Sequence, residues 1–494
     1  MKRHDLYGIL FLWVILLIVF FPLFSSTYVY TDEAVQLWLY RRGSGYEMFG
    51  AGGRGLTEKL FQWLFGSIHT IREISYLRWF SLFGWMLCIP VWYYVLNSVV
   101  INEKLPKLLT FISMVYLVTM PPFTIYIGWA AVMELFIANT AGLLSGYFLY
   151  NALAQGKKGA GLLPAIMVSV LMGCTSLFTY QSGFSCFLLP FLLPVIARYR
   201  ISKMTGQAIG VYLFIYVVYY LLFRLQLAVS HTAINERSSL HVNVLNKLVF
   251  LFTRPLNSAF HFTWLFNEKS MMGLIIYALL FGSWVLFSFF RRNGLPVRER
   301  ITYFIVVFCF FGLFYLPSLV VKENYASNRT LFALNLAVFF LVAETILSAG
   351  GNTRIKRYGV ALFSLLFILN AWYNFNREFL NPVKNEYARL RNFINDHYNS
   401  KTDTVYFIRP AEDSFEKKYG ITRSWDEFGV PSTFFEWTPE FLVRQLVFEK
   451  TGDRSVAEKI TVKNWLGQEA FIKSAVPVTP NILVVDAPGI INQD

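Results

Sequence analysis

Cysteine is scarce in this sequence, and the few that occur lack the spacing of a metal or disulfide site. The four are Cys88, Cys174, Cys186 and Cys309, and each lies within an apolar run with no CxxC pair. Cysteines in such surroundings are typically small core residues, so neither a disulfide framework nor a zinc site is predicted. A Walker loop, an HExxH motif and any set resembling Ser-His-Asp are also absent from the sequence, so it carries no signature of these common chemistries.

Charge is scarce as well. Only 15% of the residues are charged, whereas 55% are hydrophobic and 18% aromatic, and the mean hydropathy is +0.46. A chain of 494 residues with this composition is too apolar for a soluble protein and falls in the polytopic membrane class, with a lipid bilayer around it. The formal charge of +14 would suit a nucleic-acid partner, but Lys and Arg lie mainly in short segments between apolar runs. That distribution is typical of cytoplasmic loops, so no nucleic acid is predicted.

Runs of roughly 17 to 25 apolar residues predict eleven membrane-spanning α-helices. They lie near residues 7–24, 79–99, 108–125, 132–153, 161–179, 182–198, 207–227, 272–290, 302–321, 331–349 and 357–375. The first run is longer than the ~7 to 15 residues of a signal-peptide core, so we interpret it as an uncleaved span.

The basic residues orient these spans. The connections on one side carry Lys2 and Arg3; Lys104 and Lys107; Lys157 and Lys158; Arg198, Arg200 and Lys203; Arg291, Arg292, Arg298 and Arg300; and Arg354, Lys356 and Arg357. The short connections on the other side, 124–131 and 180–181, carry none. By the positive-inside rule, the N-terminus is predicted to be cytoplasmic and the C-terminal tail to lie outside.

Two outer segments, 25–77 and 228–270, are long. The first contains a glycine-rich piece at 50–55, which predicts a turn, and then residues 56–68, which suit an amphipathic helix in the membrane interface. The second contains an apolar run, 244–266, that Lys247, Arg254 and Pro255 interrupt. We predict that this run is re-entrant or interfacial.

Beyond the transmembrane domain, 1–375, the hydropathy falls and the chain reads as a small soluble α/β domain, 376–494. The patterns predict two helices and two strands there. The helices are expected at 386–397 and 439–450, and the strands at 404–408 and 482–486. This domain is expected to dock on the outer face of the membrane helices.

Adjacent carboxylates follow the first apolar run. Because that run barely crosses ~30 Å of hydrocarbon at ~1.5 Å per residue, Asp32 and Glu33 are expected at the outer interface. Partial desolvation raises the pKa of a carboxylate and suits it to general-base work, although two acids can also simply begin a solvated loop. Glu134 is expected level with Asp32, at the outer end of the fourth span. An ionisable group at membrane depth costs ~2.5 to 3.5 kcal/mol on insertion scales, which favours a functional role over helix pairing.

Several cations are predicted on the same face. They are Arg54, Arg72, Arg78, Arg224, Arg254, Lys322 and Arg329. Snorkelling at the surface explains most such residues, but Arg329 lies in a short outer turn expected beneath the tail, and Arg binds phosphate oxygens bidentately as Lys cannot. Tyr180 and Gln181 occupy a tight outer turn, where they would either meet a sugar or cap a helix.

The order of these pieces resembles a known group. An acidic pair in the first outer loop of a polytopic protein is typical of the GT-C glycosyltransferases, which use polyprenyl-phosphate sugars. More narrowly, Tyr30-Thr31-Asp32-Glu33, then Gly53-Arg54-Gly55-Leu56, then an acid in the fourth span and Tyr180-Gln181 are similar to the O-antigen glucosyltransferases of the GtrII type. The similarity covers roughly residues 1–200, with a looser echo at 329–331. Glu33 stands where that group tends to have Asp, and Gly55 where it tends to have Pro.

The resemblance implies an inverting transfer of a hexose such as glucose from polyprenyl phosphate to a cell-surface glycan or glycolipid, at the outer face of a bacterial cytoplasmic membrane. It implies that Asp32 is the base and that Glu33 and Glu134 position the acceptor or the base. Arg54 and Arg329 would face the lipid phosphate. The remaining predicted substrate-binding residues are Tyr180, Gln181, Arg254 and Lys322. No cofactor is certain, although Asp32, Glu33 and Glu134 could hold a divalent metal.

Two other functions stay open at this point. An O-antigen polymerase or ligase would take diphosphate-linked glycans and rely on arginines and a histidine in a late outer loop, for which His231, Arg237 and His241 are candidates. A transporter or flippase would need polar residues near the membrane midplane and paired repeats. The polar residues here cluster at one rim and no repeat is visible, which favours surface chemistry.

Overall fold

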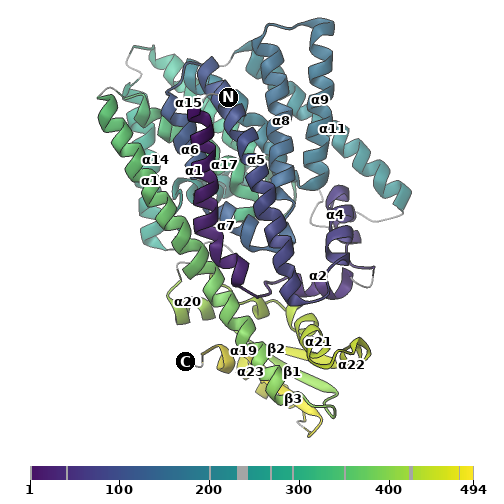
Figure 1. Cartoon of the computed structure of the whole chain (residues 1–494). Coiled ribbons are helices and arrows are strands. Elements are labelled where there is room, and N and C mark those ends of the chain that lie inside the picture. The colour runs from purple at the N-terminus through teal and green to yellow at the C-terminus, as the bar shows by residue number, and fades with distance from the viewer. Residues whose placement is uncertain are drawn as a thin grey trace.

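The computed structural model describes residues 3–40, 43–199, 202–230, 243–266, 270–291, 294–349, 352–421, 427–477 and 479–492. Most of these residues are helical, and one small sheet is present. Figure 1 places the N-terminus at one end of a long helical bundle and the sheet at the opposite end. The end of α1 (Arg3–Phe20) and the start of α5 (Ile74–Asn102), which flank the first outer segment, lie at the end of the bundle near the sheet.

Nine helical stretches of the described chain are long and apolar enough to cross a membrane. They are Asp5–Ser25, Ile71–Asn102, Ala130–Ala154, Gly159–Thr179, Gln181–Arg198, Lys203–Ser230, Met271–Arg291, Asn328–Leu347 and Thr353–His397. A tenth is reached if α6 (Lys107–Thr119) and α7 (Pro121–Gly128), which bend by 48° at their junction, are one broken span. This confirms a multi-pass helical chain.

The sequence predicts eleven spans, give or take one, and the one at 302–321 is not among the single helices that are long and apolar enough to cross a membrane. There α15 (Val297–Phe314) begins with three charged residues, Arg298, Glu299 and Arg300, and ends before a break at Tyr315. The short α16 (Leu316–Val320) follows, with a proline in its first turn. Together α15 and α16 still lead from the basic residues Arg298 and Arg300 toward Arg329 at the tail end, as the odd number of crossings in the predicted orientation requires.

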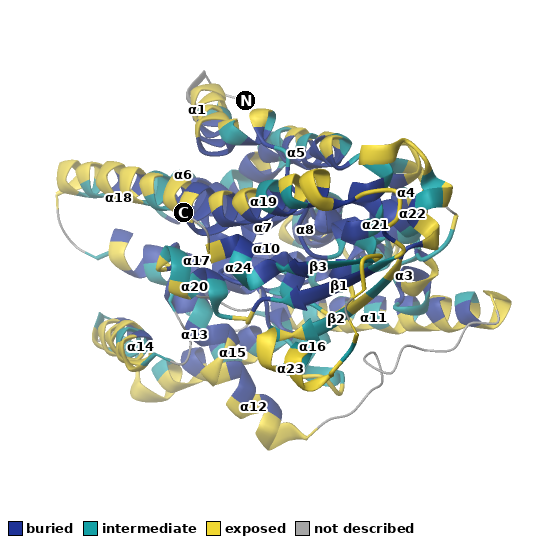
Figure 2. Ribbon diagram, turned by 90° about the horizontal axis from the view of Figure 1, so that it is seen from below, coloured by how far each residue is buried: buried dark blue, intermediate teal, exposed yellow. Residues whose placement is uncertain are grey.

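Three apolar stretches form the centre of the bundle. They are α8 (Leu135–Ala154), the stretch Gln181–Arg198 and α17 (Asn328–Leu347), and each is mostly buried within the protein. Glycine allows α8 to approach the chain at 181–188 closely, since a Cβ at Gly142 or Gly146 would collide with the backbone carbonyl of Gly183 or Phe187. Figure 2 shows the more exposed helices at the periphery, among them α14 (Met271–Arg291) and α18 (Thr353–Tyr373). The other long helices of the bundle are α1 (Arg3–Phe20), α5 (Ile74–Asn102), α9 (Leu163–Thr179), α10 (Leu189–Arg198) and α11 (Lys203–Ser230).

The first outer segment folds into three short helices at the sheet end of the bundle (Figure 1). They are α2 (Glu33–Tyr40), α3 (Glu47–Ala51) and α4 (Gly55–Gly66). The predicted helix at 56–68 is therefore confirmed, but its buried face carries Thr57, Phe61 and Phe65, while Leu56 is exposed. In the second outer segment, the break at Arg254 and Pro255 separates α12 (Val244–Thr253) from α13 (Pro255–Phe260), and neither is long enough to span.

The boundary predicted at 375 falls inside a continuous helix. The backbone stays helical from α18 through a π-helical stretch, Asn374–Leu380, into α19 (Asn381–His397). The last membrane helix therefore runs directly into the tail. A tail attached by a continuous helix is oriented more rigidly than one attached by a flexible linker.

The tail forms a three-stranded parallel sheet with helices around it. The strand order is β2 (Thr461–Leu466), β1 (Thr404–Arg409), β3 (Ile482–Asp486), and the register pairs Val405 with Val462 and with Leu483. The predicted strands at 404–408 and 482–486 are confirmed, as are the helices that correspond to α19 and α21 (Thr438–Thr451). The pattern at β2 was too polar to indicate a strand, because β2 is a partly exposed edge strand. The remaining tail helices are α20 (Ser414–Tyr419), α22 (Arg454–Lys459), α23 (Gly467–Lys473) and α24 (Ala487–Asn492).

Candidate functional site

A cavity of about 400 Å³ lies where the helical bundle meets the tail. Its lining comes from five separate parts of the chain: the first outer segment, the turn before α8, the turn after α9, the turn before α17, and the tail. The lining residues are Tyr30, Thr31, Asp32, Arg54, Trp129, Tyr180, Glu323, Tyr325, Arg329, Glu427, Phe435 and Trp437. Four residues singled out in the sequence, Asp32, Arg54, Tyr180 and Arg329, thus share one cavity.

Asp32 lies at the start of α2 and is half-buried. The preceding Thr31 has φ of 44°, in the left-handed region that a β-branched residue seldom adopts, and such strain costs ~1 to 3 kcal/mol. The surrounding hydrogen bonds must hold this turn in place. The indole Nε1 of Trp437 donates a hydrogen bond of 2.8 Å to Oδ1 of Asp32. A residue of the tail therefore contacts the carboxylate predicted to be the base.

Glu33 points away from the cavity into a fully buried network. Its carboxylate pairs with Arg78 of α5 and accepts hydrogen bonds from the N–H groups of Tyr30, at 2.7 Å, and Ala130, at 2.6 Å. Burial raises the pKa of Glu33, whereas Arg78 and the two N–H donors act in the opposite direction. Glu33 thereby ties the Asp32 turn to α5 and to the chain just before α8. Neither Glu33 nor Arg78 lines the cavity.

Arg54 is carried by the glycine-rich turn between α3 and α4. Gly53 has φ of +80°, and a Cβ there would collide with the hydroxyl of Tyr219. Tyr219 donates a hydrogen bond of 3.1 Å to the carbonyl of Gly53, and Gln181 donates one of 2.7 Å to the carbonyl of Gly52. The guanidinium of Arg54 packs over the ring of Tyr180 at 5.0 Å and forms no ion pair with any described carboxylate. Arg54 thus lines the cavity without an ion-pair partner among the described residues.

The turn at 180–181 supports Arg54. Tyr180 lines the cavity and stacks on the Arg54 guanidinium, whereas Gln181 uses its amide nitrogen on Gly52 and on the hydroxyl of Tyr219, at 3.0 Å. Gln181 is not among the lining residues. Of the two residues of this turn that were predicted to contact a sugar, only Tyr180 lines the cavity.

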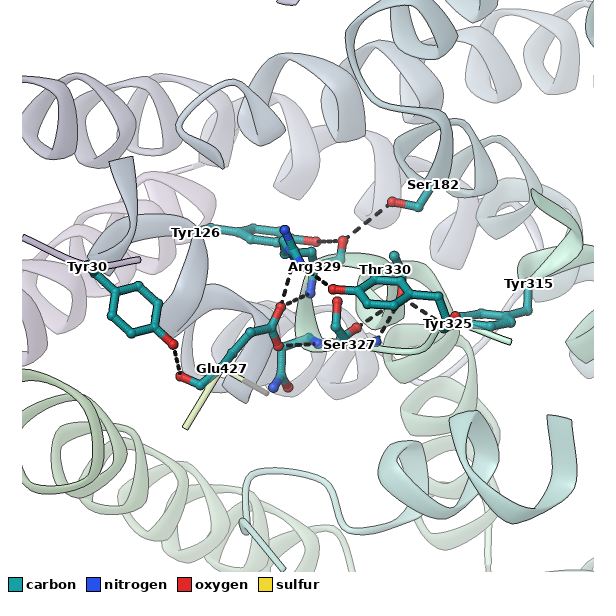
Figure 3. Close-up of polar contacts among 10 residues, drawn as sticks. Tyr30, Tyr126, Ser182, Tyr315, Tyr325, Ser327, Arg329, Thr330 and Glu427 are labelled. Carbon is teal, nitrogen blue, oxygen red and sulfur yellow. Dashed lines mark hydrogen bonds and ion pairs between the residues drawn. The ribbon is translucent and has the colours of Figure 1, made fainter. Parts of the chain in front are cut away.

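Arg329 lies in the first turn of α17 and is held from several sides (Figure 3). Its Nε donates to Oε1 of Glu427 at 3.1 Å, its Nη2 donates to the hydroxyl of Tyr325, and its guanidinium stacks over the ring of Trp129 at 4.6 Å. The Glu427 carboxylate also accepts from the N–H groups of Asn328, at 2.6 Å, and Arg329, at 3.2 Å. An acid of the tail therefore caps α17 and neutralises its arginine.

Glu134 lies just before α8 and is fully buried. Neither of its carboxylate oxygens has a hydrogen-bond partner among the described residues. The positive charges of Arg54 and Arg329 act on it through the protein. Glu134 is not part of the cavity lining.

The other predicted cations lie elsewhere. Arg254 and Lys322 are exposed and line neither this cavity nor a second one of about 410 Å³, to which Arg72 contributes. Arg224 is an exposed residue of α11. The residues on which the polymerase or ligase alternative depends, His231, Arg237 and His241, lie outside the described residues.

The three acids do not form a metal site. Within the described ranges no group of three or more His, Cys, Asp or Glu side chains is placed to hold a metal ion. Glu33 is committed to Arg78, and Asp32 accepts from Trp437. The divalent metal considered from the sequence therefore has no matching ligand set in Asp32, Glu33 and Glu134.

Sequence reasoning missed the tail's contribution to the cavity. Glu427, Phe435 and Trp437 lie outside every predicted element, in the chain between β1 and α21. The one signal they carry is local: three aromatic residues, Phe434, Phe435 and Trp437, lie within four positions of a polar domain. Aromatic residues that a small domain does not bury indicate a binding surface.

Comparison with known proteins supplies no relative for this chain. No protein-family model matches the sequence, and no curated protein matches it. The functional assignment therefore depends on the cavity and on the chemistry of its lining.

Proposed function

We propose that this protein is a membrane glycosyltransferase that moves a sugar from polyprenyl phosphate to a hydroxyl group of a glycan or glycolipid. The observation that carries the proposal is the meeting of Asp32, Arg54 and Arg329 around one cavity at the boundary between the helical bundle and the tail. A half-buried carboxylate beside guanidinium groups matches a base next to an anionic leaving group.

The reaction would be a single displacement. Asp32 takes the proton from an acceptor hydroxyl while that oxygen forms a bond to the anomeric carbon of the donor sugar. The bond between the anomeric carbon and the phosphate oxygen breaks, and the electron pair leaves with the lipid phosphate. The configuration at the anomeric carbon is inverted, and Asp32 then releases its proton to water.

The two arginines would share the leaving group unequally. Arg54 has no described carboxylate partner and rests on an aromatic ring, so its fork of N–H donors is free to bind phosphate oxygens. Arg329 already pairs with Glu427, so an incoming phosphate would have to share or replace that carboxylate. Arg54 is therefore the main phosphate ligand in this proposal, and Arg329 a secondary one.

Glu33 and Glu134 would act at a distance from the reacting atoms. Glu33, with Arg78, fixes the strained turn that presents Asp32. Glu134 lies close enough to Arg54 and Arg329 for their charges to act on its carboxyl group. Both are positioning residues in this account, and neither touches the substrate.

The position of the cavity also suggests how the protein is oriented in the membrane. The donor lipid would enter between helices, with its phosphate at the level of the cavity and its chain in the bilayer. We propose that the N-terminus is cytoplasmic and that the cavity and tail lie at the outer face of a bacterial cytoplasmic membrane. The basic connections on the side opposite to the tail support this orientation.

The decisive experiment replaces Asp32 by Asn. Asn keeps the size of the side chain and an oxygen that accepts from Trp437, but it does not take up a proton. We expect normal abundance and donor binding, with turnover lower by ~10² to 10⁴. The measurement is transfer from polyprenyl-phosphate hexose to membrane glycolipid by purified protein in lipid nanodiscs.

Two results would contradict this proposal. Wild-type turnover by a well-folded Asp32→Asn variant would remove Asp32 as the base. If the wild-type protein transferred no sugar from any polyprenyl phosphate but accepted diphosphate-linked glycans, the polymerase or ligase function would replace the one proposed here.

A further inference from the structure

We infer that Phe435 and Trp437 of the tail form an aromatic platform that binds a sugar ring of a glycan inside the cavity. The identification of that glycan as the acceptor rests on the function proposed above. The binding of a neutral sugar ring by this pair rests only on the cavity and its lining. The platform would give the tail a direct part in substrate recognition.

The two rings stack on each other, so Phe435 supports the exposed indole of Trp437. Phe435 and Trp437 stack with ring centroids 5.0 Å apart and an interplanar angle of 30°. Both line the cavity, and Trp437 is 48% exposed. An exposed indole within a soluble-type domain is unusual unless something covers it, because the ring carries a large apolar area.

The chain that carries the platform is held rigidly from below. The buried carboxylate of Glu386, in α19, accepts hydrogen bonds from the N–H groups of Ser432, at 2.9 Å, and Thr433, at 3.0 Å. Arg409, in β1, donates to the carbonyl of Phe434 at 2.8 Å. Trp437 itself directly precedes α21. Binding would therefore require little ordering of this segment, which favours affinity.

Hydrogen-bonding groups surround the aromatic surface. Asp32 accepts from the indole N–H of Trp437, and Tyr325 and Glu323 line the same cavity. A sugar has the complementary chemistry, since one face of its ring presents C–H groups while its edge presents hydroxyls. A purely apolar lipid chain would displace water from these polar residues and offer them no hydrogen bond in return, at a cost in free energy.

The contact between Trp437 and Asp32 places the platform beside the proposed base. A sugar stacked on Trp437 would present a hydroxyl to the carboxylate that its indole already contacts. The arginines Arg54 and Arg329 line the same cavity and suit an anion. The neutral ring on the platform is therefore the acceptor, and the phosphate-bearing sugar is the donor.

The test uses the full chain in lipid nanodiscs and measures binding without turnover. Saturation-transfer NMR with maltotriose and chitotriose reports contact with a hexose and an N-acetylhexosamine glycan. Trp437→Ala should lower the transfer signal at least tenfold, and Trp437→Phe should retain part of it, because Phe keeps a stacking face. Trp63→Ala is the matched control: Trp63 is 68% exposed on α4 but does not line the cavity, so its signal should equal that of the wild type.

A kinetic arm separates this inference from the proposed function. If the platform binds the acceptor, Trp437→Phe raises the KM for the acceptor several-fold and leaves the KM for the donor unchanged. A failure of all polyprenyl-phosphate donors together with a Trp437-dependent NMR signal would remove the proposed reaction but keep the platform. Equal NMR signals in wild type and Trp437→Ala, no signal with either glycan, or signals lost equally in Trp63→Ala would overturn the platform.

Discussion

Two pairs of carboxylate and arginine near the tail end of the bundle differ in their surroundings. In the pair of Glu33 and Arg78 both side chains are 0% exposed, and each is surrounded by protein. In the pair of Glu427 and Arg329 the arginine is 20% exposed and lines a cavity. The first pair has no access to another partner, whereas the second faces space that a ligand can enter. The ion pair of Glu33 and Arg78 therefore stabilises the fold, whereas Arg329 can exchange Glu427 for an anionic ligand in the cavity.

The largest expected effect comes from breaking the buried pair. Glu33→Gln leaves the Arg78 guanidinium buried without its counter-charge, which typically costs ~3 to 5 kcal/mol. We expect a large fall in abundance and in the thermal unfolding midpoint measured in detergent. Replacing both partners by Met removes both charges and should recover much of this stability. A Glu33→Gln protein that is as stable as the wild type but inactive would place Glu33 in the reaction instead.

A smaller effect is expected from the cation that faces the cavity without a partner. Arg54→Lys keeps the charge but removes the fork of N–H donors, so turnover with a polyprenyl-phosphate donor should fall by up to ~10² to 10³, the range seen when one preorganised donor is lost. The unfolding midpoint should not change. Arg254→Lys is the control, because Arg254 is exposed and outside the cavity lining. Equal turnover of Arg54→Lys and wild type would remove bidentate phosphate binding from Arg54.

The smallest effect is expected at the exchangeable pair. Glu427→Gln keeps an oxygen that accepts from α17 but loses its charge, so the free energy of unfolding should fall by about 1 kcal/mol, as for a weakened helix cap. The released Arg329 should bind donor phosphate more tightly, which lowers the KM for the donor. Enzyme kinetics and thermal unfolding measured on one preparation test both parts. A loss of stability as large as that of Glu33→Gln would show that the two pairs do not differ as described.

The sequence by itself determined the helical framework and much of the candidate site. Long apolar runs predict membrane helices because exposing them to water is costly in free energy. The structure differs from these predictions in that the runs at 108–125 and 302–321 are each divided into two helices. Local composition also singles out Asp32 and Glu33 after the first apolar run, and Arg54 in the glycine-rich piece at 50–55. Asp32, Arg54, Tyr180 and Arg329 could be named on this basis.

Only the tertiary structure decided what these residues meet. Neighbours in sequence diverge at the start of α2, so Asp32 enters the cavity while Glu33 pairs with Arg78, a residue 45 positions away. Gln181 holds a glycine turn 129 positions away, and Trp437 reaches Asp32 across 405 positions. No periodicity or local motif carries such separations. The first two depend on how the bundle helices pack, and the third depends on how the continuous helix from α18 to α19 directs the tail onto the bundle. The residues were visible in the sequence, but their partners were fixed by packing.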